Sequence, residues 1–130
     1  MPKESHLLAV KWIMRYLKGT PYLGLWYPKG LEFELKAFTD ADYGGCNLDR
    51  KSTFGRLQFL GDKLVCWASK KQHCVSTSTA EAEYVAATSC CSQVLWMQTQ
   101  LADYGFQYKK IPIYCDSRSA IAKSANRVQH

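Results

Sequence analysis

The chain has 130 residues, of which 47% are apolar and 22% are charged, and its formal net charge is +6. This length favours a single domain, the composition excludes a wholly disordered chain, and no apolar run reaches the ~20 residues that a membrane-spanning helix needs. The first six residues are too polar for a secretory signal. We therefore expect a folded intracellular protein, cytoplasmic or nuclear, with no membrane partner.

Charge is distributed unevenly along the chain. Residues 1–36 carry a net charge of +3, residues 37–104 carry −1 and residues 105–130 carry +4. Most acidic side chains therefore lie in the middle of the chain, between two basic arms. Such a balance attracts a polyanion such as nucleic acid, but clustered carboxylates would repel its phosphodiesters unless cations lie between them.

The cysteine spacing does not indicate a disulfide or zinc framework. Six cysteines and three histidines occur, without a C-x-x-C pair or a spaced histidine pair. This pattern favours reduced, mostly buried thiols.

The first expected element is a helix over residues 5–18, where apolar side chains recur at helical spacing. Ser5 is the predicted N-cap, and Gly19 followed by Pro21 ends the helix. Residues 23–27 are expected to form a short strand. We interpret residues 1–30 as a connection to an upstream module and residues 31–130 as the domain itself.

A change to period two indicates strands from residue 31 onward. The first strand, residues 35–40, places Lys36, Phe38 and Asp40 on one face. Strands over residues 54–60 and 63–69 follow, and the two residues Gly61 and Asp62 between them favour a type II′ hairpin turn. The three strands should form an antiparallel meander.

A long helix is expected over residues 79–104, because Ser78 and Glu81 fit a capping box and Gly105 follows the last turn. A strand over residues 111–115 and a second helix from 116 to about 124 come next. Three strands, a helix, a strand and a helix predict an α/β fold with a mixed sheet, whose fourth strand runs parallel to the first. Trp67 and Trp96 are expected in the core.

Three acidic residues fall at the ends of these elements. Asp40 closes the first strand, Glu83 lies in the first turn of the long helix and Asp116 closes the fourth strand. Parallel neighbouring strands would bring Asp40 and Asp116 together at their carboxyl ends, where open α/β sheets place their sites. A small-residue helix face at Ala86, Ala87 and Cys90 would let Glu83 approach them.

Converging carboxylates favour hard divalent cations, and a pair of Mg²⁺ ions suits phosphodiester cleavage. Structural interpretations remain open for each residue: a turn aspartate at 40, a helix N-cap at 116 and a first-turn acid at 83. Capping explains Glu81, which is therefore the second choice as a ligand. Asp42 is interpreted mainly as a loop acid.

Several motifs occur in an order that is similar to one known family. The chain resembles the ribonuclease H domain of copia-type LTR retrotransposon Pol polyproteins over essentially its whole length, through YLKGT (16–20), TDADYGG (39–45), DRKSTFG (49–55), WASKKQ (67–72), STAEAEY (78–84) and YCDS (114–117).

This resemblance implies a ribonuclease H-like fold that cuts the RNA strand of RNA–DNA hybrids during reverse transcription, with two Mg²⁺ ions that Mn²⁺ can replace. Asp40 matches the first acid of the family, Glu83 the second and Asp116 the third. Residues 1–30 then correspond to the end of the upstream reverse transcriptase. The family also has a fourth aspartate, a fifth strand and a final helix, and this sequence ends before them. Two interpretations are open: a fragment of a longer protein, or a truncated and decayed element in which one metal site is weakened.

The resemblance also suggests residues that contact nucleic acid. Thr79 and the chain around Asp42 are candidates for contacts to the 2′-hydroxyl groups of the hybrid. Candidates for the remaining contacts are Lys70, Lys71, Ser117 and Arg118, with solvated surface charge as the alternative for the basic ones.

Three other functions are weighed against the nuclease. An inactive nucleic-acid-binding remnant would bind hybrid without cutting it. A DNA-cutting or integrating enzyme would have its acids in the order D, D, E, whereas the order here is Asp, Glu, Asp. A purely structural connecting domain would tolerate Asp40→Asn. No small-molecule cofactor is expected for any of them.

Overall fold

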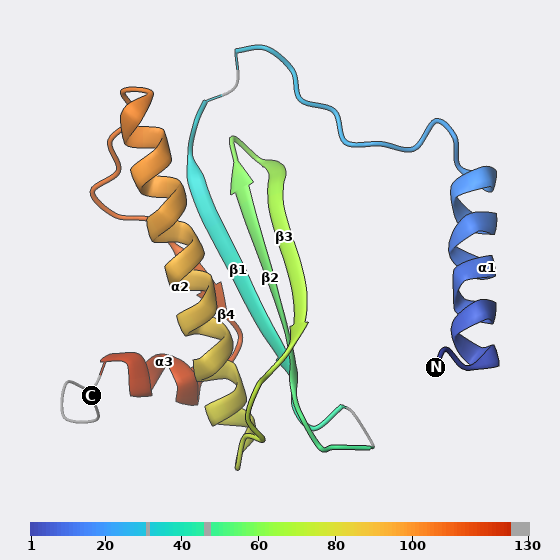
Figure 1. Cartoon of the computed structure of the whole chain (residues 1–130). Coiled ribbons are helices and arrows are strands. Elements are labelled where there is room, and N and C mark those ends of the chain that lie inside the picture. Colours follow the sequence, from blue (N-terminus) through green and yellow to red (C-terminus); the bar gives the residue numbers. More distant parts are fainter. Residues whose placement is uncertain (31, 46–47, 126–130) are drawn as a thin grey trace.

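The computed structural model describes residues 1–30, 32–45 and 48–125. In chain order, its elements are α1 (Glu4–Gly19), β1 (Leu35–Asp42), β2 (Thr53–Leu60), β3 (Lys63–Lys71), α2 (Thr79–Asp103), β4 (Ile113–Cys115) and α3 (Arg118–Ala125) (Figure 1). The predicted succession of three strands, a helix, a strand and a helix is therefore confirmed.

The strands form one mixed sheet of order β3-β2-β1-β4. The pairs β1–β2 and β2–β3 are antiparallel, whereas β1 and β4 run parallel, with Thr39 opposite Cys115. The parallel pairing needs a long crossover, which α2 provides. As a result, the carboxyl ends of β1 and β4 lie side by side.

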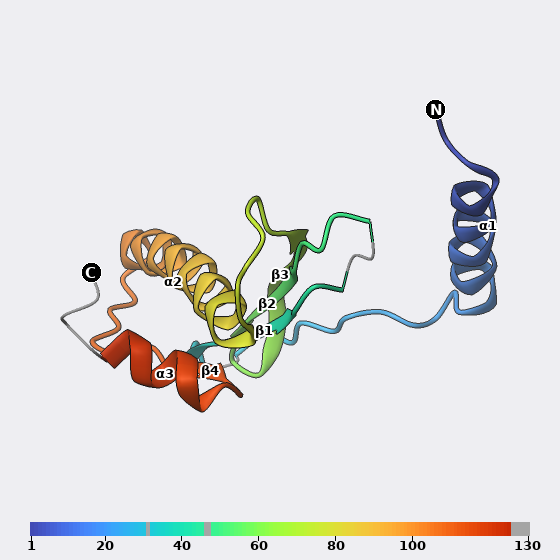
Figure 2. The same cartoon turned by 90° about the horizontal axis from the view of Figure 1, so that it is seen from below.

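The core lies between the sheet and α2, which crosses β1. Figure 2 shows α2 and α3 on one side of the sheet. Small side chains of α2, including the fully buried Ala82, Ala86 and Cys90, face β1, where Leu35 and Ala37 are also buried. Because these helix residues are small, the helix lies close to the strand and its first turn comes near the end of β1.

The β2–β3 hairpin turn differs from the predicted type. Both central residues have positive φ, +55° at Gly61 and +60° at Asp62. Positive φ at both positions defines a type I′ turn, whereas type II′ has it only at the first. The prediction of type II′ was therefore wrong. The type I′ turn also matches the right-handed twist of the flanking strands.

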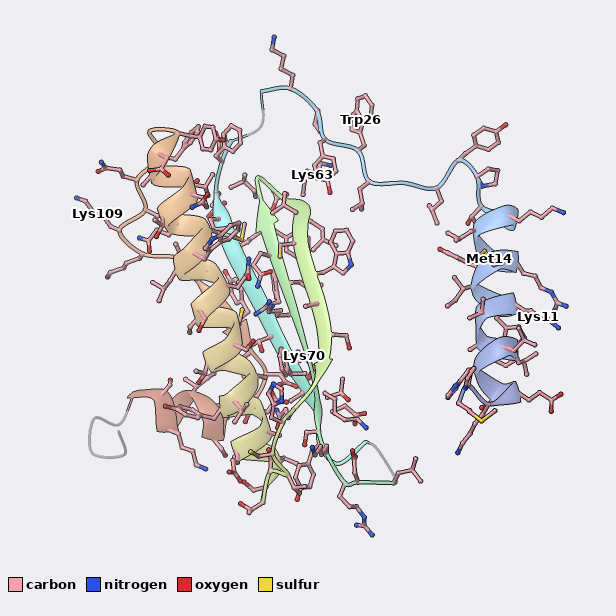
Figure 3. All side chains as sticks on the ribbon, viewed as in Figure 1. Lys11, Met14, Trp26, Lys63, Lys70 and Lys109 are labelled. Atoms are coloured by element: carbon pink, nitrogen blue, oxygen red, sulfur yellow. The ribbon has the colours of Figure 1, made fainter. Side chains whose placement is uncertain are left out.

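The N-terminal region departs most from the sequence analysis. The helix begins at Glu4, one residue before the predicted range, and its N-cap is Lys3 rather than Ser5. Residues 23–27 form no strand, because no neighbouring strand pairs with them; the Tyr27 hydroxyl instead donates a hydrogen bond to the carbonyl of Leu64. No residue of α1 is buried, and Lys11 and Met14 lie on it apart from the sheet (Figure 3).

Two predictions about burial were wrong. Trp67 is 60% exposed and Trp96 is 58% exposed, so neither tryptophan lies in the core. Trp67 lies on the face of the sheet opposite α2, and Trp96 lies on the exposed side of α2. Of the five described cysteines only Cys90 is buried, although mostly buried thiols were expected. No helix among the described residues is long and apolar enough to cross a membrane.

Candidate active site

The carboxyl ends of β1 and β4 bring two of the predicted acids to one groove. Burial alternates along β1, so Leu35, Ala37 and Thr39 face α2 while Asp40 lies on the opposite, exposed face. Asp116 follows the last residue of β4 and is also exposed. Both aspartates line a groove together with Phe38 and Tyr114, whose rings stack at 4.9 Å. The predicted meeting of Asp40 and Asp116 at this edge agrees with that placement.

Glu83 reaches the same edge from α2. It is 7% exposed, and its Oε1 accepts a hydrogen bond of 3.2 Å from the backbone N–H of Ala41, the residue after Asp40. Its Oε2 accepts a 3.8 Å contact from the thiol of Cys115. The carboxylate of Glu83 therefore lies between the ends of β1 and β4.

The electrostatics of this region disfavour a negative charge on Glu83. Burial raises the pKa of the Glu83 carboxyl, the hydrogen bond from Ala41 opposes this rise, and the charges of Asp116 and Asp40 raise the pKa further. All three acids thus affect one another. A cation among them would relieve both the repulsion and the cost of burial, and hard carboxylate oxygens are the donors that Mg²⁺ prefers.

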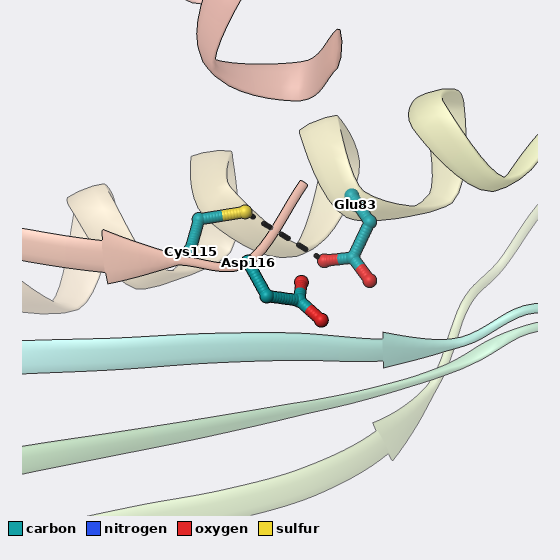
Figure 4. Close-up of side chains that lie close together, drawn as sticks. All are labelled: Glu83, Cys115 and Asp116. Carbon is teal, nitrogen blue, oxygen red and sulfur yellow. Dashed lines mark hydrogen bonds between the residues drawn. The ribbon is translucent and has the colours of Figure 1, made fainter. Parts of the chain in front are cut away.

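Among the described residues, Glu83, Cys115 and Asp116 form one group of potential metal ligands. One ligand atom from each lies within 4.8 Å of the others, and the carboxylates of Glu83 and Asp116 face each other (Figure 4). Among the residues that the structure describes, Asp40 does not belong to this group. The geometry therefore directly supports Glu83 and Asp116 as ligands of one site. Asp40 is related to this pair by the groove that it lines with Asp116 and by its charge, which acts on Glu83.

Cys115 was not a candidate in the sequence analysis. Its position directly before Asp116, at the end of a strand parallel to β1, was the available signal. Burial raises the pKa of the Cys115 thiol, and the charges of Glu83 and Asp116 raise it further. The thiol is therefore protonated and acts as a hydrogen-bond donor to Glu83.

Two alternative interpretations of the acids are now tested. The N-cap of α3 is Ser117, whose Oγ accepts a hydrogen bond from the N–H of Ala120 at 3.2 Å, so capping does not account for Asp116. Glu81 does act in capping: its N–H donates to Ser78, and its carboxylate accepts bonds of 2.6 Å from both the N–H and the hydroxyl of Thr77. The predicted N-cap at Ser78 is confirmed, but the reciprocal half of the capping box is not, because the Glu81 carboxylate accepts its hydrogen bonds from Thr77 rather than from the N–H of Ser78.

The residues predicted to contact nucleic acid lie near this edge of the sheet. Thr79 begins α2, and Ser117 and Arg118 stand at the start of α3. Thr53 pairs with Asp42 on one side and with Lys71 on the other, so Asp42 and the last residues of β3 end at the same edge (Figure 3 labels Lys70). Lys71 forms an ion pair of 3.2 Å with Asp49. Their contacts with nucleic acid stay predictions.

A mixed sheet of order β3-β2-β1-β4, with β1 and β4 parallel and carboxylates at their ends, is consistent with the ribonuclease H-like class of folds. No protein-family model matches the chain, and no solved structure matches it significantly.

Comparison of sequences then identifies the family. The chain is 43% identical over 99% of its length to the retrovirus-related Pol polyprotein from transposon TNT 1-94 of Nicotiana tabacum, and 41% identical over 100% to that from transposon RE1 of Arabidopsis thaliana. Secreted RxLR effector protein 161 of Plasmopara viticola is 35% identical over 74% of this chain and 68% of its own length. Over its whole length the chain is therefore homologous to a segment of copia-type retrotransposon Pol polyproteins. It spans 10% and 9% of the two Pol relatives.

Proposed function

We propose that the chain is the ribonuclease H region of a copia-type Pol polyprotein and hydrolyses the RNA strand of RNA–DNA hybrids during reverse transcription. The observation that carries this proposal is the convergence of acids from three elements. Asp40 on β1, Glu83 on α2 and Asp116 after β4 are far apart in sequence, and the charges of both aspartates act on the buried Glu83.

In this proposal Asp40, Glu83 and Asp116 hold two Mg²⁺ ions, which Mn²⁺ can replace. The donor set fits hard cations, because the repulsion among the three carboxylates and the burial of Glu83 both favour a bound positive charge. When bound, such ions activate a water molecule and stabilise the leaving oxygen of a phosphodiester.

The protein's own groups position the Glu83 carboxylate and leave the site open to the hybrid. The N–H of Ala41 fixes one oxygen of Glu83 and leaves the other to face Asp116. Asp40 and Asp116 line an open groove, so a strand of the hybrid has access to both. Hydrolysis of this type leaves 3′-hydroxyl and 5′-phosphate ends, as the resemblance implies.

The proposal also assigns the surroundings of the site. Asp42, Thr79, Ser117 and the basic residues Lys70, Lys71 and Arg118 would contact the hybrid, whose polyanionic backbone suits a chain of net charge +6. Residues 1–30 would belong to the end of the upstream reverse transcriptase. The exposed apolar side chains of α1, among them Leu7 and Met14, then contact that module.

The test is cleavage of a labelled RNA–DNA hybrid in the presence of Mg²⁺. We expect Asp40→Asn, Glu83→Gln and Asp116→Asn each to lower the rate by at least about 100-fold, since each removes a carboxylate from the charge-stabilising site. Glu81→Gln is the matched control, because Glu81 lies on the same helix two residues away and is bonded to Thr77. We expect it to retain the activity of the parent chain.

The other outcomes assign different functions. Hybrid binding that weakens with salt, without Mg²⁺-dependent cleavage, would identify an inactive binding remnant. Loss of activity in Glu81→Gln but not in Glu83→Gln would assign the role of metal ligand to Glu81 in place of Glu83. Equal cleavage by the parent and all three variants would refute the proposed active site.

A further inference from the structure

The cluster of Glu83, Cys115 and Asp116 contains a sulfur ligand that the proposed Mg²⁺ site does not use. One ligand atom of each residue lies within 4.8 Å of the other two, and Cys115 Sγ lies 3.8 Å from Glu83 Oε2 (Figure 4). Mg²⁺ binds oxygen, whereas thiolate ligands select softer cations such as Zn²⁺. The donor atoms of this cluster therefore fit a second class of metal ion.

The spacing of the cluster matches a tetrahedral site. A zinc ion binds sulfur at about 2.3 Å and carboxylate oxygen at about 2.0–2.2 Å, which places the two ligand atoms about 3.5 Å apart. The observed separation of 3.8 Å between Cys115 Sγ and Glu83 Oε2 differs from this by a few tenths of an ångström. Rotation of side chains alone closes such a gap, and the exposed carboxylate of Asp116 is free to follow.

A buried hydroxyl beside the cluster is an independent indication of a missing ligand. Thr39 is 6% exposed, and its Oγ1 has no hydrogen-bond partner among the described residues. Thr39 pairs with Cys115 in the parallel register of β1 and β4, so the two side chains lie side by side on the face that α2 covers. A water molecule in the fourth position of a metal ion at the cluster would satisfy this orphaned oxygen.

We propose that Cys115, Glu83 and Asp116 form a binding site for a thiophilic divalent cation of the Zn²⁺ class. Binding displaces the thiol proton to solvent and leaves a thiolate as the ligand. Because the site uses two of the three carboxylates, its occupation excludes the Mg²⁺ pair. The binding itself is independent of the nuclease activity, whereas its inhibitory consequence rests on the proposed function.

The first experiment uses Cd²⁺ as the probe, since a cadmium–thiolate bond absorbs in the ultraviolet. We expect titration of the metal-free protein to show one tight step, weakened at least about tenfold in Cys115→Ser and in Glu83→Gln. Cys91→Ser, which removes an exposed thiol of α2, and Glu81→Gln are the matched controls and should retain the tight step. A tight step that survives Cys115→Ser would overturn the proposal.

A second measurement needs no variant, so it does not depend on how Cys115→Ser folds. Equimolar Zn²⁺ should protect Cys115 of the parent protein from alkylation at least about tenfold more than it protects Cys91, measured by peptide mass spectrometry. Equal protection of both thiols would contradict a site at Cys115.

The inhibitory consequence is read from hybrid cleavage in Mg²⁺. Each protein is compared with its own rate without Zn²⁺, and the half-inhibitory Zn²⁺ concentration should rise at least about tenfold in Cys115→Ser. Zn²⁺ that binds Cys115 without slowing cleavage would refute the exclusion of Mg²⁺. If the protein shows no Mg²⁺-dependent cleavage, the nuclease proposal is refuted. The Cd²⁺ titration and the alkylation experiment would then still decide whether the metal site at Cys115 exists.

Discussion

Glu83 is a buried acidic residue, and its burial disfavours the negative charge of its carboxylate. Its side chain is 7% exposed and the charges of Asp40 and Asp116 act on it, yet within the described part of the chain only the N–H of Ala41 and the thiol of Cys115 donate hydrogen bonds to it. A carboxylate in such surroundings costs folding free energy unless a cation compensates it. Function at this residue is therefore expected to conflict with the stability of the metal-free protein.

The Glu83→Gln variant tests this conflict. The folded-state pKa of Glu83 is raised above its ordinary value of 4.5, so the folded protein keeps the proton to higher pH than the unfolded chain does. Stability from this residue is largest below pH 4.5 and falls as the pH rises through the folded-state pKa. We expect Glu83→Gln to match the parent near pH 4 and to melt at a higher temperature at pH 7.5, in the absence of divalent metal.

Glu81→Gln is the control for the sign of that effect. The hydrogen bonds from Thr77 lower the pKa of Glu81, so its charge stabilises the folded protein above its ordinary pKa and this contribution is lost as the pH falls. Melting curves of Glu81→Gln at pH 7.5 should therefore shift downward. A lower melting temperature for Glu83→Gln at pH 7.5 would contradict our reading of the site.

Gln72 is another buried polar residue, and both polar atoms of its side chain have a hydrogen-bond partner. The Nε2 group donates to the carbonyl of Ala82 at 2.9 Å, and Oε1 accepts from the hydroxyl of Ser76 at 2.7 Å. We expect Gln72→Ala to cost about 2–3 kcal/mol, because it leaves the buried Ser76 hydroxyl unpaired. Urea unfolding measures this cost, and Gln100→Ala on the exposed face of α2 should change the free energy of unfolding by less than about 0.5 kcal/mol.

At the scale of elements, the start of α2 determines where Glu83 lies. Ser78 accepts the N–H of Glu81 at 3.1 Å, and the buried face that follows at Ala82 and Ala86 packs on β1. A slip of one residue would rotate Glu83 by about 100° away from the ends of β1 and β4. The cap and the small residues therefore set the register on which the site depends.

Removal of the cap should weaken this register. We expect Ser78→Ala to cost about 1 kcal/mol of unfolding free energy, whereas Ser78→Asp should retain most of it, because aspartate accepts the same hydrogen bond. Thermal unfolding followed by circular dichroism measures both. Equal loss in the two variants would show that packing, rather than capping, fixes the start of α2.

At the scale of the molecule, α1 and the sheet are two separate bodies of structure. None of the residues of α1 is buried, whereas Leu35, at the start of β1, is 1% exposed. The helix exposes Leu7, Val10 and Met14 on its surface. Its apolar face thus contributes nothing to the core around α2 and β1.

A pair of deletions tests this division. Deletion of residues 1–19 should change the free energy of unfolding of the sheet domain by less than about 0.5 kcal/mol, because no buried surface is lost. Deletion of residues 1–36 removes the buried Leu35 and one end of β1, and it should abolish the cooperative transition in calorimetry. A large loss of stability in the shorter deletion would place α1 in the folded core.

The sequence alone was sufficient for the order of the elements from β1 to α3 and for the parallel pairing of β1 with β4, because strand period, the Ser78 cap and Gly105 are local signals. It also singled out Asp40, Glu83 and Asp116, whose role as metal ligands stays a prediction. The hairpin turn type, the absence of a strand at residues 23–27 and the exposure of Trp67 depend on strand twist, pairing partners and helix coverage, which no local pattern contains.

Only the tertiary structure decided how the acids meet. It brought Cys115 beside Glu83 and Asp116 and set Asp40 apart on the other face of β1. The physical reason is that the period of two along a strand determines which of its side chains share a face. The distance between side chains of two different strands depends instead on how the helix packs across both strands.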